Sequence, residues 1–317
     1  TEIYTLSLHD ALPIYSLQNV ETSKQVAREI VEMLKAPDIL VLEEIMDDDG
    51  SMDSEQVSAE RNIASLIDDI VDASNGEIVY KTLNIDPARN TDGGIAGGNI
   101  RTVILYQTKR GLKLAGAPAG KATEEVSLRA ENGRAMLSLN PGRIWPGNSA
   151  FVNSRKPIIA QFIFNGQDLY VIGTHFNSKS EDGPLYGDQQ PPQRSSERQR
   201  VAQAKAVNGF VRDILDINPK ALIVVVGDMN DFPWSASMKT LQSELLDNLV
   251  LTLSENQRFT YMHEGNGQAL DQILASKALA PRLVSYEVVH INSLSLPVNA
   301  SSDHDPVIAV FDLSALE

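Results

Sequence analysis

The chain has no cysteine among its 317 residues. This absence excludes disulfide bonds, thiolate nucleophiles and zinc sites built on cysteine. Basic residues are also scarce: 27 lysines and arginines stand against 42 aspartates and glutamates, which gives a formal net charge of −15. Long-range attraction to a polyanion such as DNA should therefore be weak. A protein of this charge that acts on nucleic acid must bind it through a metal ion and a few local cationic groups.

Long hydrophobic runs are missing as well. No stretch approaches the roughly 18 apolar residues that a membrane-spanning helix needs, and no basic segment followed by a hydrophobic one marks a signal peptide in this chain. Hydrophobic residues make up 42% and charged residues 22% of the sequence, which are ordinary values for a globular protein. At this length we expect one large α/β domain with a substantial core.

The N-terminal segment differs from the rest of the chain. Residues 1–14 (TEIYTLSLHDALPI) show no periodicity that continues into the following residues, and they resemble translated sequencing-adapter text. We expect residues 1–14 to be a non-native leader and residues 15–317 to form a single domain.

Helical and strand patterns alternate along that domain. Apolar residues recur about every fourth position over residues 22–37 and again over residues 195–215, which predicts two helices. Residues 38–45 and 221–226 are short apolar runs and are expected to be buried strands. Residues 157–175 form the clearest hairpin, because the Asn-Gly pair at its centre suits a tight turn. Several strands end in Asp, Glu, His or Asn, as in α/β enzymes whose site lies along one sheet edge.

Two polar residues follow the buried strand 221–226. Asp228 and Asn230 are two residues apart, so in extended geometry both side chains point the same way. One could orient or deprotonate a water molecule while the other donates a hydrogen bond to a phosphate oxygen. The same pair is common in ordinary turns, so the pattern alone is weak.

A metal site is predicted at the end of strand 38–45, which carries Glu43 and Glu44. We expect Glu44 to point inward and to bind Mg²⁺, with Mn²⁺ or Ca²⁺ as alternatives, because such hard ions take one or two carboxylates and keep several waters. Glu43, on the opposite face of the strand, is expected to be exposed. His175, where the hairpin ends, and nearby Asn177 could contact a phosphate.

A further acid–base group lies near the C-terminus. Residues 302–306 (SDHDP) place Asp303 and His304 at the start of a strand. Asp271 could orient His304 and stabilise its charge. The alternative is that each of these residues is an ordinary polar residue of a loop or of an outer strand face.

Taken in order, these segments resemble the successive motifs of the endonuclease/exonuclease/phosphatase superfamily. The matching segments are residues 42–44, 97–106, 174–179, 227–230, 270–274 and 302–306. The stretches 186–192 and 265–267 are most similar to the bacterial extracellular nucleases of that superfamily. The resemblance implies a four-layer DNase I-like sandwich, in which two mixed β-sheets are flanked by helices. It also implies secretion, a nucleic acid substrate and a monomer.

The resemblance implies a role for each candidate residue. The metal ligand is Glu44, with Asp303 close to it. Asp228 orients or activates the attacking water. Asn230 and His175 hold the phosphate. His304 is stabilised in its charged form by Asp271. Further candidates for phosphate contact are Asn99, Arg101 and Asn177. Which of Asp228 and His304 acts as the general base stays open.

Two departures from the family pattern are visible. A glutamine usually precedes the metal-binding glutamate, and here that position is Glu43. The first strand, which in this family brings an Asn to the site, has no recognisable counterpart before Glu44, so we expect it to be missing. The expected function is a metal-dependent phosphodiesterase, a nuclease acting on DNA or RNA. A phosphatase or lipid phosphodiesterase of the same superfamily, or a catalytically inactive truncated member, are the alternatives.

Overall fold

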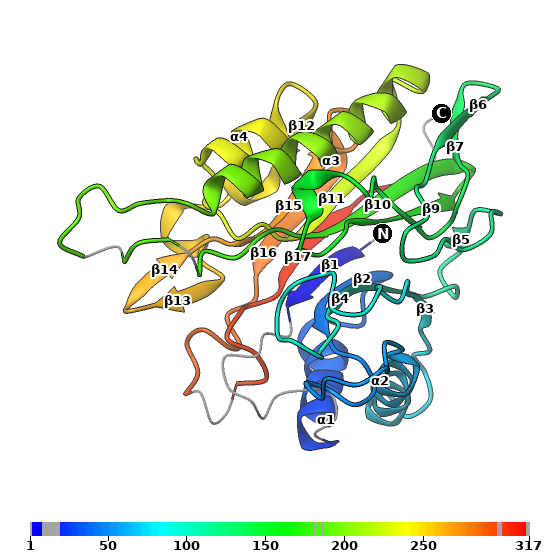
Figure 1. The fold of residues 1–317 in the computed structure, drawn as a ribbon. Coiled ribbons are helices and arrows are strands. Elements are labelled where there is room, and N and C mark those ends of the chain that lie inside the picture. Colours follow the sequence, from blue (N-terminus) through cyan, green and yellow to red (C-terminus); the bar gives the residue numbers. More distant parts are fainter. Residues whose placement is uncertain (1, 8–19, 181, 185–186, 297–299, 315–317) are drawn as a thin grey trace.

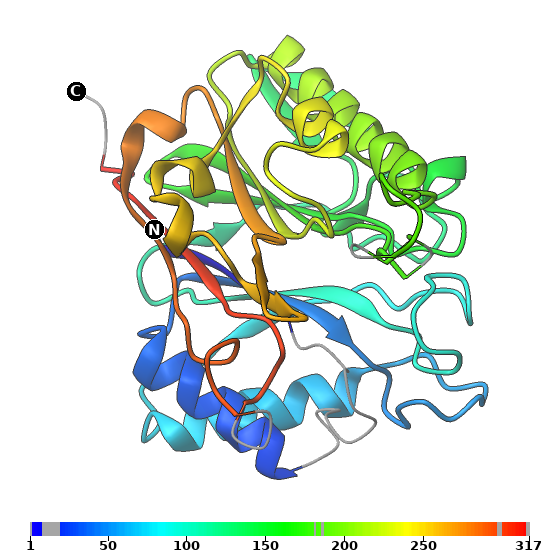
Figure 2. The same ribbon diagram turned by 90° about the vertical axis from the view of Figure 1, so that its left-hand side faces the viewer.

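The computed structural model describes residues 2–7, 20–180, 182–184, 187–296 and 300–314. Two β-sheets lie face to face at its centre, with helices on the outer face of each (Figure 1 and Figure 2). This arrangement confirms the predicted mixed α/β sandwich of DNase I-like type. No helix within these ranges combines the length and the hydropathy of a membrane span.

The first sheet has six strands in the order β16-β17-β1-β2-β4-β3. In that order the strands are Leu283–Val288, Val307–Phe311, Glu2–Ser7, Ile39–Ile45, Arg101–Tyr106 and Lys81–Leu83. Its outer face carries α1 (Val20–Arg28), continued by a π-helical turn at Glu29–Met33, and α2 (Glu60–Ala73) (Figure 1). The helix predicted over residues 22–37 is thus confirmed, although it ends earlier.

The second sheet runs β12-β15-β11-β10-β9-β5, and β8 pairs with β9. These strands are Leu246–Asn248, Asp271–Ser276, Leu222–Asp228, Gln167–His175, Ile158–Phe164, Lys113–Leu114 and, for β8, Gly142–Arg143. Its outer face carries α3 (Glu197–Ile217) and α4 (Ala236–Gln242). The predicted hairpin is β9 with β10, and the predicted helix over residues 195–215 is α3.

Smaller elements border the sheets. Two hairpins are formed by β6 (Leu128–Glu131) with β7 (Arg134–Leu137) and by β13 (Tyr261–His263) with β14 (Asn266–Gln268). Single helical turns lie at Ser149–Phe151, Leu249–Thr252, Glu255–Gln257 and Ala280–Arg282.

Three apolar layers follow from the alternation of side chains along the strands. In β2, Val41 belongs to the layer between the two sheets, whereas Leu42 packs with α1 and α2. In β11, Val224 belongs to the layer between the sheets, whereas Val225 packs with α3 and α4. The buried runs predicted as strands are therefore apolar at consecutive positions because both faces of each sheet are covered.

The expectation that a strand is missing before β2 was wrong, because β1 occupies that position in the sheet. β1 lies between β17 and β2, antiparallel to the one and parallel to the other. Main-chain hydrogen bonding is available to any residue except proline, so this segment fills the strand position even though it contains no asparagine. That residues 1–14 are a non-native leader stays a prediction, and residues 8–14 lie outside the described part of the chain.

Candidate active site

Three strand ends of the second sheet supply a row of polar side chains. The register pairs His175 of β10 with Asp228 of β11, and Asp228 with Asp271 of β15. Residues opposite each other on neighbouring strands point to the same face. The three side chains therefore form the polar end of the layer between the sheets, and all three are buried. The structure brings these predicted site residues together.

Glu43 and Glu44 reach this row from the first sheet. Oε1 of Glu44 lies 3.6 Å from Nε2 of His175, and Oε2 of Glu43 lies 4.0 Å from Nδ1 of the same ring. The prediction that Glu43 is exposed was wrong, because it is fully buried. Glu43 lies two residues after Val41 and therefore points, like Val41, into the layer between the sheets. A β-bulge follows, since the register shifts between Leu42 and Ile45 and Glu44 has a φ of 58°. The bulge breaks the alternation and brings the carboxylate of Glu44 to the site as well.

The carboxyl group of Glu43 is enclosed. Its Oε2 accepts a hydrogen bond from Oγ1 of Thr102 at 2.6 Å. Its Oε1 lies against Gly227, where a Cβ atom would come within 2.6 Å of it, and Gly227 has a φ of 143° that favours glycine. Burial raises the pKa of Glu43 well above that of an ordinary carboxyl group; the hydrogen bond from Thr102 opposes this rise and the charge of Asp228 adds to it.

Replacement of Glu43 by glutamine should stabilise the metal-free protein at alkaline pH. A carboxyl group with a raised folded pKa keeps its proton in the native state, so the free energy of unfolding falls as the pH rises from the unfolded pKa of about 4.3 toward the folded one. Glutamine keeps the shape and cannot ionise. In thermal denaturation with EDTA, we expect Glu43→Gln to raise Tm by about 3 °C or more at pH 8 and to match the wild type at pH 4. Identical pH profiles of Tm would contradict a raised pKa of Glu43.

His304 and Asp271 form a buried hydrogen-bonded pair, with Nδ1 of His304 2.7 Å from Oδ2 of Asp271. Burial lowers the pKa of His304, but the negative charges of Asp271 and Asp228 outweigh burial and raise it to about 10. In the metal-free protein the imidazole is therefore protonated at neutral pH. The ring of Tyr261 lies 4.7 Å from the imidazole, centroid to centroid. The hydrogen bond between Asp271 and His304 is the contact that Asp271 needs in order to stabilise the positive charge of the imidazole, as predicted.

Asp228 and Asn230 do not project side by side, so the prediction of extended geometry was wrong. The chain turns directly after β11, and Asn230 has a φ of 49°. Its main-chain nitrogen donates to Oδ1 of Asp228 at 2.7 Å, while its Nδ2 donates to Oδ2 of Asp228 at 2.9 Å and to the oxygen of Phe176 at 3.2 Å. Asn230 thus fixes the carboxylate of Asp228, which lies 3.5 Å from Nε2 of His175.

Asn99 and Arg101 are buried and already engaged. Nδ2 of Asn99 donates to Oδ2 of Asp47 at 2.7 Å, and its Oδ1 accepts from the nitrogen of Asn90 at 2.7 Å. The guanidinium of Arg101 donates to Oδ1 of Asp86 at 2.6 Å and to the oxygen of Asn99 at 2.7 Å. These contacts close the loop before β4 and argue against the predicted phosphate contacts of both residues.

A cleft of about 340 Å³ opens over His304 and Asn230. Lys179 lines it, and its Nζ donates to the oxygen of Asn230 at 2.5 Å. Burial lowers the pKa of Lys179 to about 8, although the charge of Asp231 opposes this. Sequence reasoning gave Lys179 no role, although it lies in the segment that begins with His175.

Asn177 lies in the same segment and is half-buried. Its main-chain nitrogen donates to Oε1 of Gln203 at 2.8 Å, and this hydrogen bond ties the segment to α3. The contact of its side chain with phosphate stays a prediction.

Carboxyl groups outnumber cations around the row, which suits a divalent metal ion. The carboxyl groups are Glu43, Glu44, Asp228, Asp271 and Asp303. Oδ1 of Asp271 and Oε1 of Glu43 accept no hydrogen bond from the described residues. Hard divalent ions prefer such carboxylate oxygens.

Besides the imidazolium of His304, a buried guanidinium lies near these groups, that of Arg155. Sequence reasoning missed Arg155 because it follows an ordinary loop. Its Nη2 donates to the oxygen of Phe176 at 2.7 Å. Burial lowers the pKa of Arg155, and the charges of Glu44 and Asp228 oppose that change. A single guanidinium balances only part of the surrounding negative charge.

Two sets of residues could hold the ion. Ligand atoms of Asp228, Asp271 and His304 lie within 4.8 Å of one another. An ion bound there would compete with the hydrogen bond between His304 and Asp271. The assignment of the metal to Glu44 and Asp303 stays a prediction.

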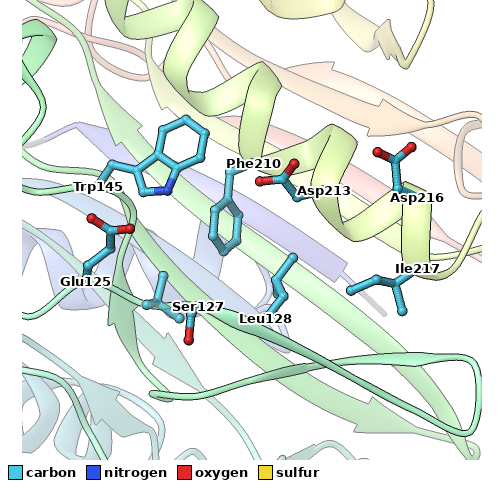
Figure 3. A pocket seen from close by; sticks show the side chains of 9 residues that line it. Glu125, Ser127, Leu128, Trp145, Phe210, Asp213, Asp216 and Ile217 are labelled. Atoms are coloured by element: carbon cyan, nitrogen blue, oxygen red, sulfur yellow. The ribbon is translucent and has the colours of Figure 1, made fainter.

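A separate groove lies beneath α3, as Figure 3 shows. Trp145, Phe210 and Leu128 form its apolar part, and Asp213 and Asp216 lie at its rim. None of the predicted site residues lines this groove, so it is distinct from the cleft over His304.

Solved structures share this fold at low sequence identity. Truncated TDP2 from Caenorhabditis elegans has a TM-score of 0.60 and 18% identity, covering 98% of this chain and 96% of that chain. TDP2 from D. rerio, complexed with single strand DNA product, has a TM-score of 0.57 and 16% identity, covering 98% of each chain. A mannosyl-6-phosphatase from Bacteroides thetaiotaomicron has a TM-score of 0.59 and 15% identity, covering 98% of this chain and 99% of that chain. At these identities the likeness establishes the fold alone.

Sequence comparison identifies the family. Comparison with curated proteins gives no match. A sequence model of the endonuclease/exonuclease/phosphatase family, in contrast, matches residues 15–304. Since this match covers most of the chain and the strand-end carboxylates and histidines converge as described, the chain belongs to the endonuclease/exonuclease/phosphatase family and is a phosphoric ester hydrolase.

Proposed function

We propose that this phosphoric ester hydrolase is a divalent-metal-dependent phosphodiesterase that cleaves nucleic acid. The observation that carries the proposal is the row of His175, Asp228 and Asp271, completed by His304, which lines the cleft. The walls of that cleft include cationic and aromatic side chains, among them Lys179. A nucleotide presents an anionic phosphate and a flat base, and such walls complement both.

The proposed reaction is hydrolysis: the oxygen of a water molecule forms a bond to phosphorus, the ester P–O bond to the leaving oxygen breaks, and that oxygen takes up a proton from solvent. A bound divalent ion would polarise a phosphoryl oxygen, and Glu44 and Asp303 are the residues that would hold it. Asp228, fixed by Asn230, accepts the proton of the water. His304, which holds a proton, donates a hydrogen bond to the phosphoryl group, and Asp271 keeps the imidazolium charged. Asp228 is proposed as the general base because two hydrogen bonds from Asn230 fix its carboxylate in place.

The fold does not discriminate between nuclease and phosphatase, since its structural neighbours include TDP2 with a single strand DNA product and a mannosyl-6-phosphatase. Matched substrates therefore provide the test. With Mg²⁺ or Mn²⁺, we expect kcat/KM for DNA or RNA oligonucleotides to exceed that for p-nitrophenyl phosphate and sugar phosphates by at least about 100-fold. EDTA should abolish both activities, and parallel assays with Ca²⁺ identify the preferred ion.

If kcat/KM is higher for p-nitrophenyl phosphate and sugar phosphates than for the oligonucleotides, the protein is a phosphatase of this fold and not a nuclease. A lipid phosphodiester included in the same series tests the remaining alternative. Export from a bacterial cell, membership of the extracellular nuclease branch and a monomeric state stay predictions.

A further inference from the structure

Two aromatic rings are stacked on each other shortly after the turn that follows β11 and contains Asn230. The ring centroids of Phe232 and Trp234 lie 5.0 Å apart, and their planes differ by 10°. Trp234 is 58% exposed, which is unusual for the side chain with the largest apolar surface. Since Phe232 covers one face of Trp234, and Lys179 lies over the ring of Phe232, the flat surface that a ligand can reach is the outer face of Trp234.

Cationic side chains accompany both rings. Nζ of Lys179 lies 4.5 Å from the ring centroid of Phe232, and Cζ of Arg194 lies 5.7 Å from that of Trp234. Glu197 lies 3.9 Å from Arg194, and the charge of Asp231 acts on Lys179, so this positive charge is partly balanced, in a chain of net charge −15. The combination of a flat apolar face with adjacent cations is complementary to a base and its flanking phosphates.

Phe232 connects the catalytic cleft to a larger groove. It lines the cleft that contains His304 and Asn230, and it also lines a neighbouring groove of about 930 Å³ together with Trp234. Lys239 and Arg258 line that groove, and among its described residues Glu255 is the acidic one. An extended polyanion bound in the cleft over His304 could therefore continue across the stacked rings and into the groove.

The turn that carries the rings is held by buried hydrogen bonds. Asp231 accepts from Nε of Arg200 at 3.0 Å and from Oγ of Ser237 at 2.7 Å. Nε2 of Gln272 donates to the oxygen of Asp231 at 2.8 Å. Because these partners come from α3, α4 and β15, the rings need little ordering when a ligand binds.

We propose that Phe232 and Trp234 form a stacking platform for an unpaired nucleobase, so that the preferred substrate of the site is single-stranded nucleic acid. This inference rests on the proposed nuclease function. The bases of a duplex are stacked on one another and cannot place a face on an aromatic ring without unpairing, whereas an unpaired base can. The platform positions the nucleotide next to the scissile phosphate.

Intrinsic fluorescence tests the platform independently of turnover, since the chain has two tryptophans. Trp145→Phe leaves Trp234 as the reporter, and Trp234→Phe leaves Trp145, in the groove of Figure 3, as the matched control. Both are studied with Mg²⁺ in an Asp228→Asn background, so that the oligonucleotide survives. Titration with hexathymidylate should change the emission of Trp234 and leave that of Trp145 unchanged. An abasic oligomer of equal length and charge should bind about tenfold more weakly, as expected for the loss of one base stack.

A second measurement uses the active enzyme. Trp234→Ala should raise KM for a single-stranded oligonucleotide about tenfold with kcat nearly unchanged, whereas Trp145→Phe should alter neither. Equal binding of the abasic and thymidylate oligomers, tighter binding of a duplex, or an unchanged KM in Trp234→Ala would overturn the platform. If the wild type binds the thymidylate at Trp234 but cleaves no nucleic acid, the proposed function fails and the platform stands. If nucleic acid is cleaved but KM is unaltered in Trp234→Ala, the platform fails and the proposed function stands.

Discussion

Replacing His304 with alanine should lower kcat by about a thousandfold at saturating substrate and metal. The substitution removes the imidazolium that is held against the cleft by Asp271 at 2.7 Å. A positioned proton donor and the charge that it carries commonly account for a loss of this size. The measurement is kcat at pH 7 on the oligonucleotide identified as the best substrate, with circular dichroism to verify the fold.

A second histidine–aspartate pair supplies the matched control. Nδ1 of His290 lies 2.8 Å from Oδ2 of Asp305, so the pair has similar chemistry, but His290 does not line the cleft. We expect His290→Ala to change kcat by less than about threefold, the size of effect that a change away from the reacting groups has. A comparable collapse of activity in both variants would show that the C-terminal segment, rather than the proton on His304, was disturbed.

Glu44→Gln should weaken metal binding by at least about 100-fold, because the amide is neutral and a hard cation loses an anionic ligand. The concentration of Mg²⁺ that gives half-maximal activity should rise by the same factor. The side chain lies 3.6 Å from His175, within the carboxylate group whose charge Arg155 balances only in part. Titration of activity with Mg²⁺, supported by calorimetric titration of the metal alone, measures the shift.

Glu287→Gln is the control for this titration, since Glu287 is an exposed glutamate on β16 of the same sheet. It should leave the metal dependence unchanged. If Glu44→Gln also leaves it unchanged, the ion binds elsewhere, and the group of Asp228, Asp271 and His304 becomes the site to substitute next.

The fold was predictable where side chains alternate regularly or follow a helical period. The hairpin of β9 and β10, the buried β11 and the helix α3 all follow from the pattern and were expected. β1 was not expected, because its place in the sheet depends mainly on main-chain hydrogen bonds to β2 and β17. The sequence of residues 1–14 shows no periodicity that continues into the following residues.

The site was predictable as a set of strand ends but not in its local geometry. The pairing of His304 with Asp271 and the proximity of His175 to Asp228 follow from where the strands end. The convergence of both Glu43 and Glu44 on the site and the turn at Asn230 do not, because positive φ angles at Glu44 and Asn230 interrupt the alternation on which the prediction was based. Burial of Arg101 likewise depends on a long-range partner, Asp86, which local sequence cannot reveal.

The row of His175, Asp228 and Asp271 is set by strand register, and this limits how the chain can change in length. Sliding β11 by one residue would turn Asp228 toward α3 and remove it from the row. A single insertion or deletion inside β10, β11 or β15 would thus destroy the hydrolytic site in one step. The segment between β10 and α3, by contrast, borders the cleft without fixing the register, so it can lengthen or shorten. Substrate preference can therefore diverge through loop length while the hydrolytic row stays constant.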